Sequence, residues 1–222
     1  MTNNTQSKSE LKPTNIPWLG DIPADWEVRR LKQVGKIING STPSGDKKEF
    51  WDGDIDWITP TDLGKTNNPN IYSSQRKIST LGLESCGTSL VPKNSIIMSC
   101  RAPIGSLGIT TKEMCTNQGC KSFIPNKFVN YRFLYYNFVS SNEYFQSLGK
   151  GTTFQEISSS DFGNSIFLLP PLETQQAIVE YLDIETAKID TLIDTITQEI
   201  ELTREYKQSL IYKAVTGKIS VG

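Results

Sequence analysis

The apolar residues of the last fifty positions recur at alternating intervals of four and three residues, with Glu185 and Glu199 at two positions of the same register. This spacing is typical of a long amphipathic helix whose apolar seam packs against another helix. Two prolines at 170–171 precede the pattern and Gly217 follows it, so the predicted helix covers 172–217 and is on the order of 60 Å long. A helix of that length needs cover from another helix, unless it folds back on its own domain. The seam consists of Ile178, Leu182, Ile189, Leu192, Ile196, Thr203, Tyr206 and Leu210.

Before the helix, short stretches rich in Ile, Val, Leu and Trp alternate with turn signals of Gly, Pro, Asn and Asp. Such spacing predicts short strands joined by polar loops. Only the aromatic-rich stretch 131–148 has the pattern of a helix. We therefore expect an α+β fold: a flexible N-terminal tail over 1–15, one mixed α/β domain over 16–171, and the long helix. The expected strands are 26–31, 36–38, 55–58, 95–99, 106–110 and 165–169.

Length and composition agree with one domain and one arm, because the chain has 222 residues, of which 36% are hydrophobic, and no internal repeat. No apolar run approaches the roughly 18 residues of a membrane span, and the first fifteen residues lack the apolar core of a secretion signal. We expect a cytoplasmic protein with no membrane partner. The four cysteines form no close Cys-x-x-Cys pair, which favours reduced, half-buried thiols over a zinc site.

The chain has no histidine, which weighs against an enzyme because most acid–base and nucleophile-activating sites use an imidazole. It also has no glycine motif of the phosphate-binding or dinucleotide-binding kind, so we expect no cofactor. Asp52, Asp54 and Asp56 suggest a metal site, but the tryptophans at 51 and 57 favour a turn that enters a strand. We expect neither a metal nor a catalytic residue.

Charge is unevenly distributed along the chain, although the net charge is only −1. Residues 1–172 carry 18 Lys and Arg against 15 Asp and Glu, whereas 173–222 carry 5 against 9. A net charge near zero argues against strong non-specific binding to nucleic acid, because contacts with phosphates supply most of that affinity. A protein that borrows positive charge from a partner remains compatible with this balance.

Eight short motifs, in their order along the chain, resemble those of the DNA-specificity subunits of type I restriction-modification systems. The resemblance extends over almost all of 16–222. Each motif is weak by itself, and the shared order carries the resemblance. The motifs are WLGDIPADWEV (18–28), GSTP (40–43), DWITPTDL (56–63), RAPIG (101–105), TNQG (116–119), GTTF (151–154), LPPLETQ (169–175) and AVTGK (214–218).

This resemblance implies a subunit without catalysis of its own that selects the double-stranded DNA site for a separate methyltransferase subunit, with or without a restriction subunit. Family members usually contain two target-recognition domains and two long helices, and this chain has the pattern of one of each. Two copies related by a two-fold axis would rebuild the usual arrangement and would read an inverted repeat with a fixed gap. The seam residues would then form the homodimer interface. Two alternatives remain: the chain pairs with a different half subunit, or it is a truncated remnant of a longer subunit.

The acidic outer face of the helix is a candidate surface for docking the methyltransferase, with ordinary solvated charge as the alternative. That face includes Glu180, Asp183, Asp190, Asp194, Glu201 and Glu205.

Candidate DNA-binding residues lie on polar loops, because base readout needs Arg, Lys, Asn or Gln, and phosphate contacts use cations, hydroxyls or backbone amides. Arg101 and Gln118 lie in shared motifs, so we expect them to hold the fold or a phosphate rather than read a base. The aromatic residues Trp51, Trp57, Tyr72 and Phe154 are expected in the core. The DNA-binding candidates are Ser41, Thr42, Lys47, Lys48, Lys65, Asn67, Asn68, Arg76, Lys77, Arg101, Gln118, Lys150, Gly151 and Thr152.

Two functions of other classes stay open at this point. One is a metal-dependent nuclease built on the aspartates 52, 54 and 56, which metal-dependent cleavage would support. The other is a scaffold whose helix brings two methyltransferases together while its domain reads no sequence.

Overall fold

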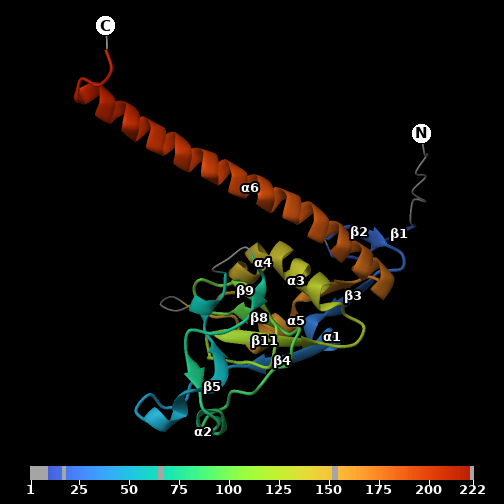
Figure 1. Ribbon diagram of the computed structural model, residues 1–222. Helices are drawn as coiled ribbons and strands as arrows, with labels where there is room; N and C mark the ends of the chain where they lie inside the picture. Colours follow the sequence, from blue (N-terminus) through green and yellow to red (C-terminus); the bar gives the residue numbers. More distant parts are fainter. Residues whose placement is uncertain (1–9, 17–18, 65–67, 152–154, 221–222) are drawn as a thin grey trace. The chain divides into compact units, whose positions relative to one another are not determined.

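The computed structural model describes residues 10–16, 19–64, 68–151 and 155–220 (Figure 1). Two compact units divide the chain, Met1–Val179 and Glu180–Gly222. The first unit is a mixed α/β domain, and the second consists mainly of one helix. The α+β prediction with a long C-terminal helix is confirmed.

A five-stranded sheet is the centre of the first unit, with strand order β4-β11-β8-β9-β6. Its neighbours pair antiparallel, except that β6 runs parallel to β9. The sheet is buried on both faces, since side chains alternate along a strand: Ile96 and Phe123 enter one apolar cluster, and Ile97 and Cys120 enter another. Its strands are β4 (Gly35–Asn39), β6 (Asn70–Ile71), β8 (Ile96–Ser99), β9 (Leu107–Thr110) and β11 (Cys120–Pro125).

Short helices cover one face of this sheet with an aromatic cluster. The rings of Phe138 and Phe145 lie 5.3 Å apart, those of Phe138 and Phe162 5.6 Å apart, and Phe123 of the sheet meets both Phe138 and Phe162 edge to face. Such edge-to-face pairs add stabilisation beyond the burial of area. The helices are α1 (Leu31–Val34), α3 (Tyr131–Ser140), α4 (Asn142–Ser147) and α5 (Ser159–Asn164).

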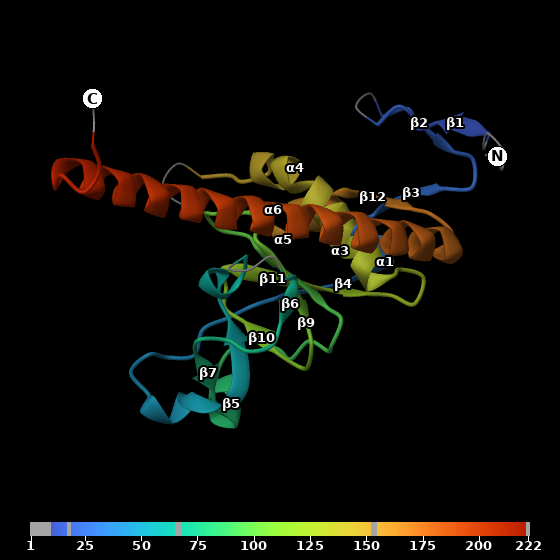
Figure 2. The same cartoon turned by 45° about the horizontal axis from the view of Figure 1, so that its top comes forward.

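A three-stranded sheet of order β10-β5-β7 lies beside the central sheet in the first unit (Figures 1 and 2). Its apolar cluster consists of Trp57, Ile78 and Cys115, with Trp51 and Ile55 packed against it. The elements here are η1 (Lys48–Phe50), β5 (Trp51–Ile58), η2 (Pro60–Asp62), β7 (Lys77–Ile78), α2 (Thr80–Glu84) and β10 (Cys115–Thr116).

Two further strand pairs complete the unit: β1 (Leu11–Pro13) with β2 (Asp21–Pro23), and β3 (Glu27–Arg30) with β12 (Ile166–Leu169). Each of the six expected strands has a counterpart within a few residues of its expected bounds. Residues 1–9 of the expected tail lie outside the described residues, whereas Leu11–Pro13 pair with β2 instead of forming a tail.

The expectation of a single helix in the domain, over 131–148, is wrong. That stretch is divided into α3 and α4 at Ser141, whose ψ of 11° leaves the α-helical region. Three more short helices, α1, α2 and α5, were missed because each has six residues or fewer, too few to show a helical period. Asn130 caps α3, since its side-chain oxygen accepts the N–H groups of Arg132 and Phe133.

The long helix α6 (Leu172–Val215) has 44 residues, and its start belongs to the first unit. Gln175 and Val179 are its buried residues, and Ile178 packs against the domain core. In the second unit six threonines donate their hydroxyls to the carbonyl four residues earlier, which satisfies these groups inside the helix. They are Thr186, Thr191, Thr195, Thr197, Thr203 and Thr216.

Candidate functional site

Two turns that are far apart in sequence are held together at the end of β4. The backbone N–H of Ser41 donates to the Thr116 carbonyl at 3.0 Å, and the Thr42 hydroxyl donates to Oε1 of Gln118. Gly40 packs directly on the Asn117 carbonyl, where an added Cβ would overlap the backbone. The absence of a side chain at Gly40 is therefore what allows the two turns to meet.

Arg101 and Lys150 lie next to these turns, and each is paired with a carboxylate. Arg101 Nε donates to Glu156 Oε2 at 2.9 Å, and Lys150 Nζ lies 2.9 Å from Asp161 Oδ2. The Cys100 N–H donates to Gly119 and the Ile157 N–H donates to Cys100, so backbone bonds join this segment to the turns. We call the surface formed by 40–42, 100–101, 117–119, 150–151 and 156 the loop junction.

Hydrogen bonds to Lys150 and Ser158 hold the pKa of the Asp161 carboxyl below its ordinary value. Asp161 is therefore negative at neutral pH, as is required for its ion pair with Lys150.

Lys121 is a cation beside the loop junction that the sequence analysis missed. Its side chain is only 5% exposed, and its Nζ donates to Asn39 Oδ1 at 3.2 Å. The same Asn39 oxygen accepts the Ser159 hydroxyl at 2.7 Å. Lys121 was missed because it lies inside an apolar strand, and no loop signal marks it.

A second group of predicted residues surrounds two tryptophans of β5. The Trp51 and Trp57 rings pack edge to face at 5.2 Å, and their indole N–H groups donate to the carbonyls of Ser44 and Ser41. The Arg76 guanidinium lies 3.8 Å from the centre of the Trp51 ring and 5.6 Å from that of Trp57. We call this pair of rings the tryptophan platform.

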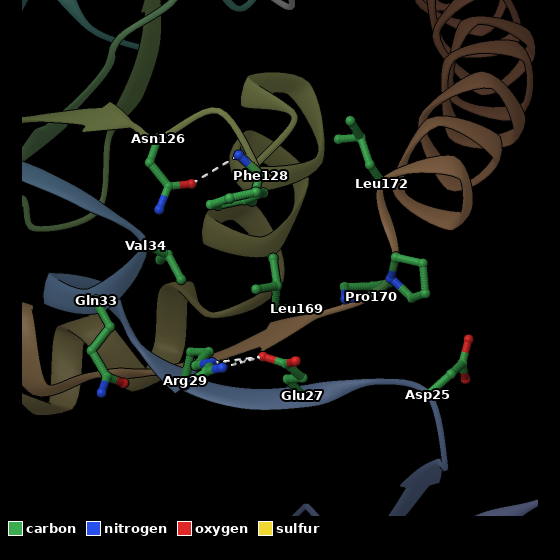
Figure 3. A pocket seen from close by; sticks show the side chains of 11 residues that line it. Asp25, Glu27, Arg29, Gln33, Val34, Asn126, Phe128, Leu169, Pro170 and Leu172 are labelled. Carbon is green, nitrogen blue, oxygen red and sulfur yellow. Dashed lines mark hydrogen bonds and ion pairs between the residues drawn. The ribbon is translucent and has the colours of Figure 1, made fainter.

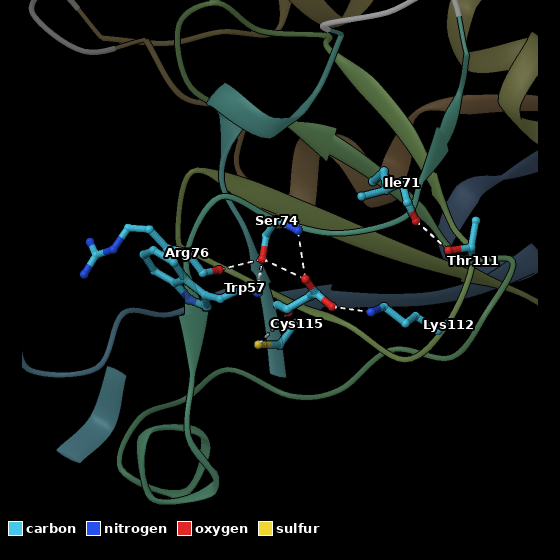
Figure 4. Close-up of polar contacts among 8 residues, drawn as sticks. Trp57, Ile71, Ser74, Arg76, Thr111, Lys112 and Cys115 are labelled. Atoms are coloured by element: carbon cyan, nitrogen blue, oxygen red, sulfur yellow. Dashed lines mark hydrogen bonds and ion pairs between the residues drawn. The ribbon is translucent and has the colours of Figure 1, made fainter. Parts of the chain in front are cut away.

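The backbone of Arg76 is fixed by a network around Asp56 (Figure 4). The Arg76 carbonyl accepts hydrogen bonds from the Ser74 hydroxyl at 2.5 Å and from the backbone N–H of Trp57 at 3.3 Å. Asp56, only 2% exposed, accepts the Ser74 N–H at 2.8 Å and pairs with Lys112 at 2.6 Å. Burial by itself would raise the pKa of the Asp56 carboxyl, but the hydrogen bonds from Lys112 and Ser74 outweigh burial and lower it.

The other lysines of this group lie close to the platform. Lys47 Nζ lies 5.1 Å from the centre of the Phe50 ring, Lys48 begins η1, and Lys77 lies in β7 opposite Asp56. The expectation of core burial holds for Trp57, which is 3% exposed, and is wrong for Tyr72, which is 61% exposed. Trp51 is half-buried under Arg76.

The remaining DNA-binding candidates contribute little that can be placed. Asn68 is exposed, and its Oδ1 accepts the Asn70 N–H at 2.9 Å, which closes a turn. Gly151 is exposed with φ of +123°, a conformation that favours glycine. The candidates Lys65, Asn67 and Thr152, and the aromatic Phe154, lie outside the described residues.

A cavity of about 570 Å³ lies between β3, β12 and the start of α6 (Figure 3). The ion pair of Glu27 and Arg29, 2.6 Å apart, lines it together with the apolar side chains of Phe128 and Leu172. Among the described residues that line this cavity, none is a nucleophile with an adjacent base. Across the described residues, no three His, Cys, Asp or Glu side chains are grouped so that they could hold a metal ion. The three aspartates of β5 do not form one cluster, because Asp56 is buried and paired with Lys112, whereas Asp52 and Asp54 are exposed.

The predicted seam of the long helix is exposed over most of its length. Ile189, Leu192, Ile196, Tyr206 and Leu210 have between 44% and 69% of their surface exposed. Ile178 packs on the domain core and Leu182 is half-buried. The Thr203 hydroxyl donates to the Glu199 carbonyl of its own helix. Within the described part of the chain, no helix combines the length and apolar character of a membrane span.

Comparisons with known proteins agree on one family. Residues 23–202 match the family described as type I restriction modification DNA specificity domain. The specificity subunit of the type I restriction enzyme MjaIX of Methanocaldococcus jannaschii is 36% identical over 197 residues, which cover 88% of this chain and 44% of that protein. The EcoR124I/EcoR124II specificity subunit of Escherichia coli is 32% identical over 200 residues, covering 84% of this chain and 48% of that protein.

Solved structures share the fold. A chain from a study of complex assembly and conformational transition of the type I R-M system aligns with a TM-score of 0.74 at 23% identity, over 88% of this chain and 47% of that one. The HsdS subunit of Thermoanaerobacter tengcongensis aligns with a TM-score of 0.68 at 23% identity, over 90% of this chain and 47% of that one. The chain thus spans about half the length of the proteins that it matches.

Proposed function

Because the chain belongs to the type I restriction modification DNA specificity family, we propose that it binds double-stranded DNA at a specific sequence and directs a separate methyltransferase subunit to that site. The observation that carries this proposal is the convergence of polar loops within the family match: Thr42, Gln118, Arg101 and Lys150 meet at one surface although up to 108 positions separate them. Binding residues commonly lie on loops that a rigid sheet holds in place.

In this proposal residues 16–171 form the recognition domain, and two surfaces of it contact DNA. The loop junction contacts phosphates, since its cations are paired but exposed and its hydroxyl and amide groups are good phosphate donors. Lys121 adds positive charge beneath that surface. The tryptophan platform, with Arg76, Lys77, Lys47 and Lys48, reaches the base edges. The candidates at 65, 67, 68 and 151–152 flank these surfaces in sequence.

The helix over 172–217 would join two copies of the chain and set the distance between their recognition domains. The exposed seam supports this proposal. Leaving five large apolar side chains in water is unfavourable in free energy, and their coiled-coil register allows a second helix to bury them. An antiparallel homodimer then reads an inverted repeat. A different protein that offers a matching helix would give an asymmetric bipartite target.

The same helix would dock the methyltransferase through its acidic outer face, and a restriction subunit would join the assembly through that enzyme. No catalytic step is assigned to this chain, because its relatives are described as specificity subunits and not as the enzymes that cleave or methylate DNA.

A methylation map of DNA from cells that carry this chain and its methyltransferase tests the proposal, compared with cells that lack only this chain. We expect a methylated bipartite motif with a fixed gap that disappears with the chain. An inverted repeat indicates a homodimer, and an asymmetric motif indicates a second subunit. Methylation that is independent of the chain would contradict the proposal and favour the scaffold.

A further inference from the structure

Arg76 is presented on the tryptophan platform as a fixed donor of hydrogen bonds. Its guanidinium lies 3.8 Å from the centre of the Trp51 ring, in the range of a cation–π contact, and Trp57 supports Trp51 from the side. Both indoles are themselves anchored by their N–H groups to carbonyls of the 41–44 loop, at 2.9 and 3.1 Å. The platform therefore restricts the guanidinium without using its hydrogen-bonding edges.

The backbone that carries Arg76 is equally restrained. Ser74 bonds to the Arg76 carbonyl and to buried Asp56, and the Gln75 N–H donates to Asp62 Oδ1 at 2.9 Å. Residues 74–76 are thus fixed at each position by a hydrogen bond, so the guanidinium is positioned from both ends of its side chain. Side-chain rotamer freedom that a free surface arginine would lose on binding is already reduced here.

No acceptor satisfies the guanidinium among the described residues. It has five N–H donors, and within that part of the chain neither a hydrogen bond nor an ion pair reaches them. Arg29 and Arg101 provide a contrast, because each is paired with a carboxylate. A restrained, exposed and unpaired arginine is suited to an acceptor that comes from outside the chain.

DNA offers the guanidinium two kinds of acceptor, phosphate oxygens and the edges of the bases. Strand β5 supplies both indoles and also carries the exposed carboxylates of Asp52 and Asp54. Lys47 and Lys77 also lie close to the platform, so its local charge is mixed and does not by itself favour a phosphate. A planar arginine fork matches O6 and N7 of guanine, the commonest specific contact in the major groove.

We propose that Arg76, held against the Trp51 ring by its cation–π contact, reads one guanine in each half of the DNA target through O6 and N7. This inference rests on the proposed function, and it assigns the specificity at one base pair to one side chain. Trp51 acts as a positioning residue, because it touches Arg76 and not the base.

The test uses the full chain together with its methyltransferase and duplexes that contain the mapped target. Each guanine is replaced in turn by 7-deazaguanine, which lacks the N7 acceptor, and the affinity is measured for the wild type, Arg76→Lys and Arg76→Ala. We expect one guanine in each half-site at which the wild type loses roughly 5- to 150-fold in affinity, the equivalent of ~1–3 kcal/mol, and at which Arg76→Ala is indifferent to the replacement. Arg76→Lys should lose less than the wild type, because an ammonium still donates to N7 but lacks the planar fork. Arg29→Ala, which removes an arginine outside the platform, is the matched control and should keep the wild-type profile.

Two substitutions of Trp51 test whether a loss of base preference reflects the position of Arg76 or a loss of folding. Trp51→Ala should keep the preference for the same guanine but reduce it, whereas Trp51→Phe should retain most of it, because a phenyl ring still supports the guanidinium. Thermal unfolding midpoints confirm that the variants are folded.

Three results would overturn the assignment. Uniformly weaker binding of Arg76→Ala to every duplex, with a shallower dependence on salt, would make Arg76 a phosphate contact. An unchanged base preference in Arg76→Ala would remove Arg76 from recognition. Loss of methyltransferase assembly in Arg76→Ala, with base preference intact, would assign the residue to a protein contact. By contrast, a wild type without any sequence preference would contradict the proposed function itself.

Discussion

The side-chain oxygen of Gln175 accepts the backbone N–H of Asn130 at 2.8 Å, which joins the first turn of α6 to the cap of α3. The same amide donates from Nε2 to the carbonyls of Phe128 and Pro170, both at 2.9 Å, and the side chain is fully buried. A buried amide with three partners fixes where the long helix begins, because each partner would otherwise be left without a hydrogen bond.

Replacing Gln175 with leucine should therefore destabilise the domain by about 2–4 kcal/mol. Leucine has a similar size but leaves the Asn130 N–H and the Phe128 carbonyl unsatisfied, at ~1–3 kcal/mol for each buried group. Urea unfolding followed by tryptophan fluorescence measures the loss. Gln198→Leu, at an exposed glutamine of the same helix, is the control and should change the free energy of unfolding by less than about 1 kcal/mol. Equal effects of the two variants would contradict the role given to Gln175.

Asp56 makes stability depend on pH in the acid range. Its folded-state pKa is lowered, so its contribution is fully present above its unfolded value of 3.8 and is lost as the pH falls through the folded-state pKa. Asp56→Asn removes the ion pair with Lys112 and should cost about 2 kcal/mol at pH 7. Below pH 3.8 the difference between the variant and the wild type should shrink, because the wild-type carboxyl becomes neutral as well. A difference that stays constant from pH 7 to pH 2.5 would show that the charge of Asp56 contributes nothing.

The exposed seam predicts self-association that two substitutions should abolish. Leu192→Glu combined with Ile196→Glu places charge in the seam and should weaken the dimer at least about 100-fold, given ~1.5–3 kcal/mol for each large apolar side chain that is buried. Sedimentation velocity at micromolar concentration measures the effect. Asp194→Ala, one of the acidic outer-face positions, should leave the association unchanged. A monomeric wild type would contradict the homodimer.

The cysteines should differ in reactivity. Burial raises the pKa of the Cys115 thiol to about 12 and also raises the pKa values of Cys100 and Cys120, so these thiols carry almost no reactive thiolate at pH 8. Cys86 is only half-buried. A disulfide reagent should modify one thiol quickly in the native protein and all four after denaturation. Cys86→Ser should lose the fast reaction, and a fast thiol that persists in this variant would be evidence against the burial of the others.

Periodicity predicted the elements whose burial repeats regularly. The long helix and strands such as β8 are evident in the sequence because their apolar residues recur at a fixed spacing. The short helices α1, α2 and α5 are set by local caps and by packing on the sheet, and neither leaves a period in the sequence. The division of 131–148 at Ser141 depends in the same way on how Phe138 and Phe145 pack against each other.

The candidate DNA-binding loops were predictable as polar turns, but their grouping was not. The sequence places Thr42 and Gln118 in separate motifs, and only the fold brings them into hydrogen-bond contact. Trp51 and Arg76 are 25 positions apart, and their stacking follows from the pairing of β5 with β7. Lys121 had no signal at all, because a lysine within an apolar strand is indistinguishable from a strand residue whose side chain reaches the surface.

The indoles of Trp51 and Trp57 hold the 41–44 loop by its main-chain carbonyls, which are the same whatever side chains the loop carries. The attachment is therefore indifferent to the identity of the residues that face outward. Substitutions at Ser44 or at the lysines that follow can accumulate without releasing the loop. Under the proposed function, exchange of a few surface residues would change the DNA target while the framework stays in place.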